Sequence, residues 1–266
     1  MLTALIHYNA PGETIEEFLD YAAETGFEAV ELQWRDVWPE EGEPEKEAER
    51  VRKLLDERGL KCSQLAAGND FVVWDDEAVQ AQVERMERIC RLAQILGAPC
   101  VRTEGGQPKD SVPEEMWIPA IANCLLNCAD FLEDMGIILA VDNHGYVTNN
   151  VDVLLTVLEY VDSPLVGTNL DTMNYRWYGY PVEVLPYIYE RVAPWVKHTH
   201  LKDGTGSRKD YKGCALGEGE IPLEKAVQAL KRAGYQGVWC AEYEGPRDTS
   251  AEGYSRCLSW IKAHCF

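Results

Sequence analysis

Residues 137–171 read IILAVDNHGYVTNNVDVLLTVLEYVDSPLVGTNLD, and this stretch contains the repeating unit of the whole chain. A short apolar run ends in Asp142, a helical pattern follows over Val151–Tyr160, and a second apolar run ends in Asp171. Apolar strands separated by one helix are typical of parallel sheets in α/β folds. The stretch therefore predicts a strand–helix–strand unit in which each strand ends in a carboxylate.

The same alternation of strand and helix extends along the entire sequence. Strands are predicted at Leu2–Tyr8, Glu28–Trp34, Lys61–Ala67, Cys100–Glu104, Ile137–Asp142, Val166–Asp171, Val196–Lys202 and Val238–Tyr243. Helices are predicted from the Thr14 cap to Thr25 and at Pro44–Arg58, Glu77–Leu96, Glu114–Met135, Val151–Tyr160, Val182–Val192, Leu223–Ala233 and Ser255–Ala263. Thr14 with Glu17 three residues later is a capping-box pattern.

Eight strand–helix units predict a (β/α)8 TIM barrel that spans residues 1–266 as a single domain. Such barrels need about 250 residues, which the 266 residues of this chain supply. An open doubly wound sheet is the alternative, but no Gly-x-Gly-x-x-Gly follows the first strand.

Composition limits the partners of this chain. Its formal charge of −20 disfavours nucleic acid and anionic membranes, because both are bound through clustered Lys and Arg. The nine cysteines are odd in number and form no Cys-x-x-Cys pair, which is typical of reduced thiols. Without a signal-peptide pattern or a membrane span, we expect a cytoplasmic protein.

Four polar residues stand at the expected ends of four successive strands: Asp142, Asp171, His200 and Glu242. They are 29, 29 and 42 residues apart, each close to one strand plus one helix and its loops. In barrels of this kind the reacting groups lie at the carboxyl ends of the strands. Three carboxylates and one imidazole suit a divalent cation. Taken singly, Asp142 or Asp171 is equally well explained as a cap of the following helix.

Four motifs, in order, resemble those of the xylose isomerase-like barrels, the sugar phosphate isomerase/epimerase superfamily. They are Val141-Asp142-Asn143-His144-Gly145, Leu170-Asp171-Thr172, His198-Thr199-His200-Leu201-Lys202-Asp203 and Ala241-Glu242-Tyr243-Glu244-Gly245. The resemblance implies one divalent metal, Mn²⁺ first and Mg²⁺, Co²⁺ or Zn²⁺ as alternatives, held by Asp142, Asp171, His200 and Glu242. It also implies proton transfer through an enediolate on a keto sugar or polyol.

The chain departs from the epimerase pattern at two positions. Residue 142 is Asp where that family has Glu, and Asn174 stands where tagatose-3-epimerase-like enzymes place a His. Because Asp142 is one methylene shorter, we expect His144 to be the base, with Glu242 as the other catalytic group. His144 lies two residues after Asp142 and imidazole titrates near neutral pH. A structural role for His144 remains the alternative.

Several further polar or aromatic residues at this rim are candidates for substrate binding: His7, Arg102, Glu104, His198, Lys202 and Trp177. Arg102 would contact a substrate anion or pair with Glu104, and Lys202 would contact a substrate oxygen or pair with Asp203. The expected substrate is a small neutral sugar. With only five histidines the chain is a poor match to endonuclease IV, which shares the fold but needs more histidines for its multi-metal site.

Two alternatives to an isomerase or epimerase remain open. The Asp-x-His arrangement is reminiscent of superfamily lyases that cleave a 3-keto sugar or glycoside by β-elimination, as in the large subunit of C-glycoside deglycosidases. The barrel would otherwise be a partner-dependent subunit that is inactive alone. Either a homo-oligomer or a hetero-oligomer is compatible with the sequence.

Overall fold

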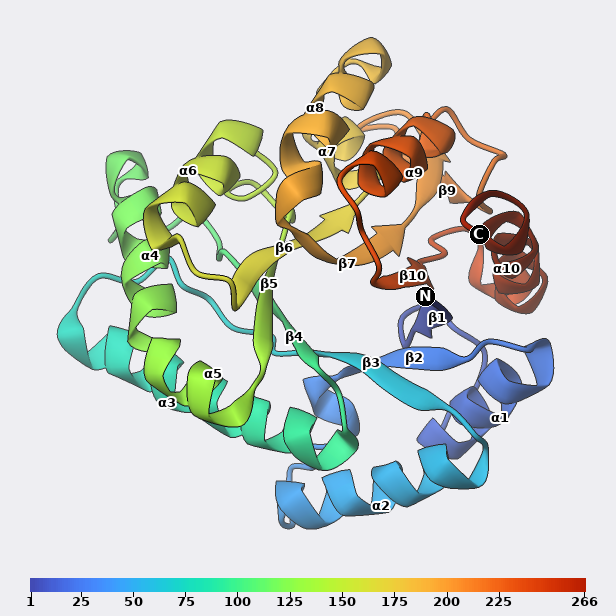
Figure 1. The fold of residues 1–266 in the computed structure, drawn as a ribbon, viewed down its shortest axis with the longest axis horizontal. Helices are drawn as coiled ribbons and strands as arrows, with labels where there is room; N and C mark the ends of the chain where they lie inside the picture. Colours follow the sequence, from blue (N-terminus) through green and yellow to red (C-terminus); the bar gives the residue numbers. More distant parts are fainter.

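Eight parallel strands close into a barrel in the computed structural model, which describes residues 1–266 (Figure 1). Around the barrel the strands follow the order β1-β10-β7-β6-β5-β4-β3-β2. Their bounds are β1 Leu2–Ile6, β2 Ala29–Gln33, β3 Lys61–Ala66, β4 Cys100–Glu104, β5 Ile138–Asp142, β6 Val166–Asp171, β7 Val196–Leu201 and β10 Val238–Ala241. The predicted single-chain (β/α)8 barrel is confirmed.

The helices form an outer layer around the strands (Figure 1). They are α1 Ile15–Thr25, α2 Pro44–Glu57, α3 Asp76–Leu96, α4 Trp117–Asn127, α5 Ala129–Met135, α6 Val151–Val161, α7 Asn174–Tyr178, α8 Leu185–Val192, α9 Leu223–Arg232 and α10 Ser250–His264. The capping box predicted at α1 is present, because the Thr14 hydroxyl accepts from the Glu17 amide at 3.2 Å and the Glu17 carboxylate accepts from the Thr14 amide.

Three segments differ from the sequence prediction. The single helix expected over 114–135 is divided at Cys128 into α4 and α5, and at this point the Cys128 amide donates to the Leu125 carbonyl, three residues earlier, at 3.1 Å. The short helix α7 follows β6 directly. A two-stranded hairpin of β8 (Asp203–Thr205) and β9 (Lys212–Cys214) follows β7. Both unpredicted elements lie at the carboxyl ends of strands, where they border the candidate site.

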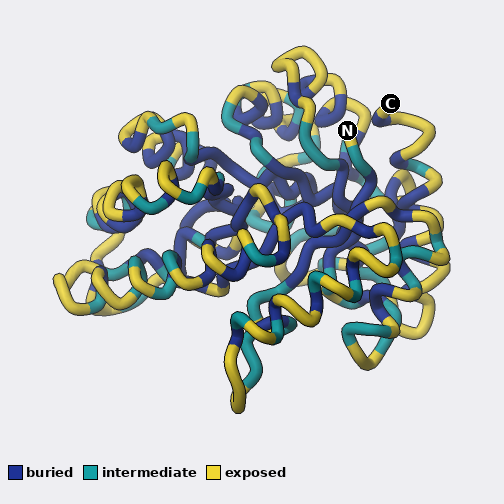
Figure 2. Tube along the Cα trace, turned by 60° about the horizontal axis from the view of Figure 1, so that its bottom comes forward, coloured by how far each residue is buried: buried dark blue, intermediate teal, exposed yellow.

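The strands are buried and the outer faces of the helices are exposed (Figure 2). The main apolar core lies between the outward-facing strand residues and the inner faces of the helices. A separate small cluster fills part of the barrel interior with Ala4, Ile6, Ala29 and Cys240. The rest of the interior is polar, since Glu31, His198 and His200 are each at most 1% exposed. The barrel therefore carries buried charge along its axis.

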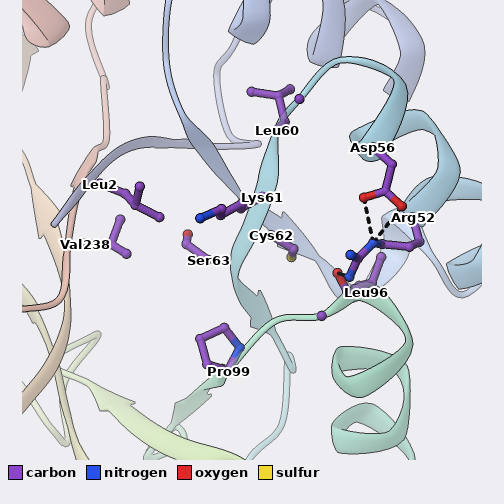
Figure 3. A pocket seen from close by; sticks show the side chains of 12 residues that line it. Leu2, Arg52, Asp56, Leu60, Lys61, Cys62, Ser63, Leu96, Pro99 and Val238 are labelled. Carbon is purple, nitrogen blue, oxygen red and sulfur yellow. Dashed lines mark hydrogen bonds and ion pairs between the residues drawn. The ribbon is translucent and has the colours of Figure 1, made fainter.

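A cavity of about 500 Å³ lies at the amino-terminal end of the strands (Figure 3). Leu2, Val238 and Pro99 line it together with Lys61 and Ser63. Near it, burial raises the pKa of the Cys62 thiol to about 12, which keeps the thiol protonated. This cavity is lined by no histidine, and the candidate site lies at the opposite rim.

All nine cysteines are free, and only Cys214 is not buried. No helix has both the length and the apolar character that crossing a bilayer requires.

We predict that the core between strands and helices stabilises the barrel. Leu139→Ala, at a fully buried position of β5, should lower the free energy of unfolding by about 2–5 kcal/mol, because it removes apolar contacts and leaves a cavity. Leu126→Ala is the matched control, since Leu126 is 44% exposed on α4 and should change it by less than about 0.5 kcal/mol. Urea unfolding followed by circular dichroism measures both, and equal midpoints would contradict this assignment of the core.

Candidate active site

The four residues predicted to bind metal lie together at the carboxyl ends of neighbouring strands. Asp142 and Asp171 are the last residues of β5 and β6, His200 lies in β7, and Glu242 directly follows β10. All four are buried, with Glu242 the most exposed at 7%. Above them a cavity of about 520 Å³ opens to solvent, and Asp142, Glu242 and His144 are among its lining residues.

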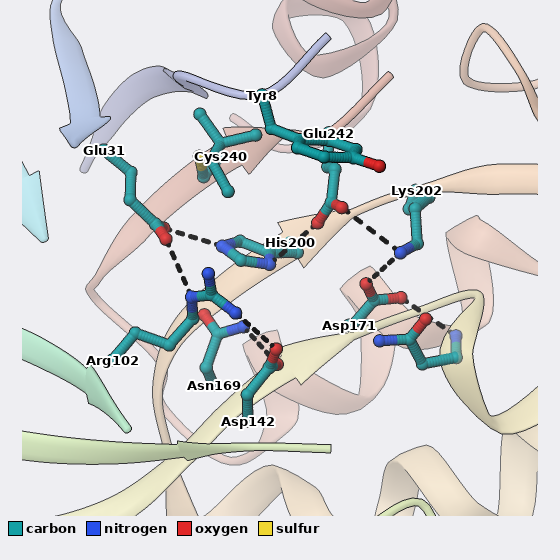
Figure 4. A network of polar contacts seen from close by, with 12 residues as sticks. Tyr8, Glu31, Arg102, Asp142, Asn169, Asp171, His200, Lys202, Cys240 and Glu242 are labelled. Carbon is teal, nitrogen blue, oxygen red and sulfur yellow. Dashed lines mark hydrogen bonds and ion pairs between the residues drawn. The ribbon is translucent and has the colours of Figure 1, made fainter. Parts of the chain in front are cut away.

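Three of the four residues form a compact set of ligand atoms. One such atom from each of Asp171, His200 and Glu242 lies within 4.8 Å of the other two (Figure 4). The His200 Nδ1 is 2.9 Å from the Glu242 Oε2. The Lys202 ammonium lies between the two acids, 2.7 Å from the Asp171 Oδ2 and 3.3 Å from the Glu242 Oε1. These contacts bring together β6, β7 and the end of β10.

Two atoms of this set are buried without a well-directed hydrogen bond: the Asp171 Oδ2 and the His200 Nδ1. The Lys202 ammonium is close enough to the Asp171 Oδ2 to balance its charge, and so is the Glu242 carboxylate to the His200 Nδ1. Neither of these two contacts has the direction of a hydrogen bond. Two such atoms facing the same small space, with a Glu242 carboxylate beside them, fit a cation that accepts both lone pairs.

Asp142 lies in the same mouth but has other partners. Its Oδ2 accepts from the Arg102 guanidinium at 2.9 Å, and its Oδ1 accepts from the Asn169 amide at 2.8 Å. The Arg102 Nε also donates to the Glu31 Oε1 at 3.0 Å (Figure 4). The structure therefore groups three of the four predicted ligands and places the fourth carboxylate against Arg102. Arg102 and Glu104 are further apart, at 4.0 Å.

Glu31 is a further residue of this candidate site, a polar residue of the rim to which the sequence patterns assigned no role. It lies in β2, is completely buried, and its Oε2 is 2.6 Å from the His200 Nε2. Burial raises the pKa of Glu31, but His200 and Arg102 outweigh this effect and leave the pKa below its usual value. As an acceptor for Nε2–H, Glu31 orients the imidazole so that Nδ1 faces Asp171 and Glu242. An acid in the middle of the apolar run Ala29-Val30-Glu31-Leu32 was the signal in the sequence.

His198 lies beneath His200, inside the barrel. Its Nδ1 is 3.1 Å from the Asn169 Oδ1 and its Nε2 is 3.2 Å from the Ser63 hydroxyl. Burial lowers the pKa of His198 to about 4, so the ring is neutral at pH 7. The residue is 1% exposed and does not line the cavity, so the structure places this candidate substrate contact in a supporting position.

His144 has the free, partly exposed ring that a general base needs. Its side chain is 45% exposed, lines the cavity and lies 3.7 Å from the Asp142 Oδ2 through Nδ1. The loop that carries His144 is held by hydrogen bonds of its backbone and not of the imidazole. The His144 amide donates to the Thr148 hydroxyl, and this hydroxyl donates to the His144 carbonyl. The ring is therefore available to a bound molecule.

The remaining candidates for substrate binding occupy different parts of the rim. His7 and Glu104 line the cavity, and the His7 Nδ1 is 2.9 Å from the Asp36 Oδ1. Trp177 lines an adjoining hollow. Lys202 pairs with Asp171 and Glu242 rather than with Asp203, whose carboxylate accepts from four backbone amides of the following loop.

Fold and sequence together define the class of this protein. The chain belongs to the xylose isomerase-like TIM barrel family, whose model matches residues 19–264. This confirms the resemblance inferred from the four strand-end motifs.

Individual relatives are more distant. The chain is 26% identical to a putative hydroxypyruvate isomerase of Streptomyces coelicolor, covering 91% of this chain and 88% of the relative. It is also 26% identical to the L-ribulose-5-phosphate 3-epimerase UlaE of Shigella flexneri, covering 95% and 90%. A solved structure of the IolI protein with a bound zinc atom superposes with a TM-score of 0.81 at 15% identity, covering 100% and 98%. That last similarity concerns the fold.

We predict that Arg102 stabilises the fold by neutralising two buried acids. Arg102→Met should lower the free energy of unfolding by about 3–5 kcal/mol, because Glu31 and Asp142 would remain buried without their cation. Arg50→Met is the control, since Arg50 pairs with Glu16 and Glu47 at the surface and should cost about 0–1 kcal/mol. Both are compared by urea unfolding in the presence of a chelator, and equal losses would refute the buried-pair argument.

Proposed function

We propose that this chain is a divalent-metal-dependent isomerase or epimerase of a neutral keto sugar or polyol, acting through proton transfer next to a carbonyl. The site is proposed to hold one metal ion through Asp171, His200 and Glu242, with Asp142 beside the ion and bound to Arg102. Manganese is the first choice, and Mg²⁺, Co²⁺ and Zn²⁺ are alternatives for such an oxygen and nitrogen donor set.

The observation that carries this proposal is the charge balance inside the barrel. Four carboxylates are buried there: Glu31, Asp142, Asp171 and Glu242. Arg102 and Lys202 are the two permanent cations among them. Four negative and two positive charges leave two negative charges to be compensated. Burial lowers the pKa of His200, but Glu31 and Glu242 outweigh it and raise the pKa well above its usual value, so without a metal a proton on His200 balances one of the two charges. A buried charge is stable only when it is paired, so one divalent cation would complete the network.

The pKa of Asp171 supports the same conclusion. Burial raises this pKa to about 7, since the nearby Lys202 offsets burial only in part and Glu242 and Asp142 add further negative charge. A second positive partner next to the Asp171 Oδ2 would keep the carboxylate ionised at neutral pH.

The side chains of this mouth are suited to moving a proton. A bound metal would polarise the oxygens of a substrate carbonyl and its neighbouring hydroxyl. His144, with its free ring at the edge of the cavity, would take the proton from the adjacent carbon. The Lys202 ammonium, 3.3 Å from the Glu242 Oε1, would stabilise the negative charge of the resulting enediolate. In an isomerase the protonated His144 would return the proton to the neighbouring carbon. In an epimerase Glu242, having first taken a proton from solvent, would donate it from the opposite face, and His144 would release its own proton to solvent.

The relatives support the reaction class, and the electrostatics support a neutral substrate. The two relatives named above carry the names of an isomerase and an epimerase. One of those names includes a sugar phosphate. The cavity is lined by five acids and only two arginines, and one of these, Arg102, is committed to Glu31 and Asp142. We therefore favour a sugar without phosphate.

One observation keeps a lyase as the second candidate. An epimerase of two carboxylates needs an acid on each face of the substrate, but Asp142 is held by Arg102 and Asn169. His144 as a single exposed base fits β-elimination from a 3-keto sugar or glycoside, the chemistry of C-glycoside deglycosidase-like subunits. In that case the purified chain would bind metal and show no turnover until a second subunit is added.

We predict that the metal depends on Asp171 and much less on Asp142. The metal affinity of Asp171→Asn should fall by more than about 100-fold. Removal of a residue that only supports a metal ligand already lowers the affinity by roughly 10–100-fold, and the loss of a ligand should cost more. Asp142→Asn is the matched control, because it removes one charge from the same mouth without removing a proposed ligand, and it should retain near-stoichiometric metal. Elemental analysis and titration calorimetry with Mn²⁺ measure both. Retention of metal by Asp171→Asn would remove Asp171 from the site, and loss in Asp142→Asn would make Asp142 a ligand.

We predict that His144 moves the substrate proton. In D₂O, D-fructose and related neutral ketohexoses should take up deuterium at the carbon next to the carbonyl, and His144→Ala should slow this exchange by about 10²–10⁴-fold. His264→Ala, which changes an exposed histidine on α10, is the control. A near-normal exchange rate in His144→Ala would return the base role to Glu242. Metal loss in that variant would show that His144 supports the metal instead.

A further inference from the structure

We propose that the cavity at the amino-terminal end of the barrel binds a monocarboxylate with a short apolar chain. The carboxylate pairs with the Lys61 ammonium, and the apolar chain lies against the hydrophobic residues around it. Ser63 relays the occupancy of the cavity to His198 inside the barrel. This second site lies at the end of the barrel opposite the candidate active site and does not depend on the reaction proposed above.

The cavity has the size and the lining of a small-molecule site. Its volume of about 500 Å³ falls within the range of about 300–1,000 Å³ that is typical of ligand pockets. The apolar part of its lining consists of Leu2, Leu60, Leu96, Pro99 and Val238. Such a wall provides the contact area for a hydrocarbon chain, while the few polar groups among these residues fix the head of the ligand.

Lys61 is the charged group of this cavity that has no partner. The Arg52 Nε lies 3.0 Å from the Asp56 Oδ1, and the Arg52 Nη1 donates to the last carbonyl of α3 at 3.0 Å. Lys61 extends from the start of β3 toward Leu2 and Val238, and none of the interactions drawn in this view reaches it (Figure 3). The chain has 45 acidic and 25 basic residues, so an ammonium without an acid beside it is unusual here. Its position at an apolar cavity selects for an anion with an apolar part.

Ser63 connects this cavity to the interior of the barrel. It lines the cavity from β3, and its hydroxyl oxygen is 3.2 Å from the His198 Nε2. The His198 Nδ1 is 3.1 Å from the Asn169 Oδ1, and the Asn169 amide donates to the Asp142 Oδ1 at 2.8 Å. These four side chains form one chain of hydrogen bonds that begins at the cavity and ends at the candidate active site.

The chemistry of the groups fixes the direction of each hydrogen bond in this chain. A carboxylate only accepts, so the Asn169 nitrogen faces Asp142 and the Asn169 oxygen faces the His198 Nδ1, which donates to it. In the neutral ring Nε2 is then the acceptor, and the Ser63 hydroxyl donates to it, although the Val30 carbonyl also lies 3.1 Å from this hydroxyl. A ligand carboxylate takes the Ser63 proton in place of His198, because hydrogen bonds to a charged acceptor are stronger. Occupancy of the cavity therefore removes the hydrogen bond to the His198 Nε2.

Three probes separate the two parts of the ligand: hexanoate, acetate without the chain, and 1-hexanol without the charge. Titration calorimetry of the full chain is performed with a chelator, so that no metal competes for the carboxylate. We expect hexanoate to bind at least about 100-fold more tightly than acetate, because each of its four additional methylenes strengthens binding by about fourfold when buried. Hexanoate should also bind at least about tenfold more tightly than 1-hexanol, since a hydrogen bond to a charged group is worth a factor of this size. No saturable binding of hexanoate, or equal binding of hexanoate and 1-hexanol, would overturn the proposal.

A pair of lysine variants locates the binding. Lys61→Met keeps the length of the side chain and removes its charge, so it should abolish the preference for hexanoate over 1-hexanol. Lys53→Met is the matched control, because Lys53 is an exposed lysine of the neighbouring helix α2 that does not line the cavity. Both positions are exposed, so neither change should disturb the fold. A preference for hexanoate that survives Lys61→Met, or that is lost in Lys53→Met, would contradict the proposed site.

The relay through Ser63 is measured by ¹⁵N NMR of the histidine side chains. Hexanoate should shift the His198 Nε2 resonance, identified by its absence in His198→Gln, and leave His7 at the opposite rim unchanged. In Ser63→Ala, hexanoate should still bind but no longer shift His198. An unshifted His198 in the hexanoate-saturated wild-type chain, or the same shift in Ser63→Ala, would refute the relay and with it the proposal. Neither measurement requires metal or turnover, so both outcomes are independent of the proposed function.

Discussion

The pairing of buried acids with buried cations is the constraint on which this barrel depends. The interior of a TIM barrel is usually filled with branched apolar side chains. Here Glu31, Arg102 and Asp142 form a continuous ion-paired chain across β2, β4 and β5. Glu31 continues this chain to His200 on β7. The chain of charges therefore ties together strands that are not hydrogen-bonded neighbours, such as β2 with β4 and β2 with β7, and the proposed metal position is the end of that chain.

The same pairing includes residue 142, where the chain departs from the epimerase pattern. The Asp142 carboxylate accepts from Arg102, which also donates to Glu31. Burial lowers the pKa of Arg102, but Glu31 and Asp142 outweigh it and raise the pKa above its usual value. The shortened acid, the arginine and the buried Glu31 thus form one unit. His144 is left as the ionisable group with an unbonded ring beside it.

Elements added to the minimal barrel shape the approach to the site. The helix α7 supplies Trp177, and the β8–β9 hairpin supplies Tyr211 and Arg208 between its strands. The Asp203 carboxylate fixes the loop after this hairpin by accepting from the amides of Gly217 and Gly219. Gly219 has to be a glycine, because an added Cβ would lie 2.2 Å from the Asp203 Oδ1. Loop variation on a constant barrel is the usual way in which this fold acquires specificity.

The sequence by itself determined the barrel and the rim, because strand periodicity, glycine helix ends and the position of Asp142, Asp171, His200 and Glu242 at strand ends are local patterns. It did not determine the partners of those groups. The pairing of Arg102 with Glu31, 71 residues earlier, and of His200 with Glu31, 169 residues earlier, arises only when the barrel closes. Closure of the barrel also brings Asp171, His200 and Glu242 together and leaves Asp142 paired with Arg102. Which charges compensate each other depends on their distance in space and on their burial, not on their spacing in the sequence.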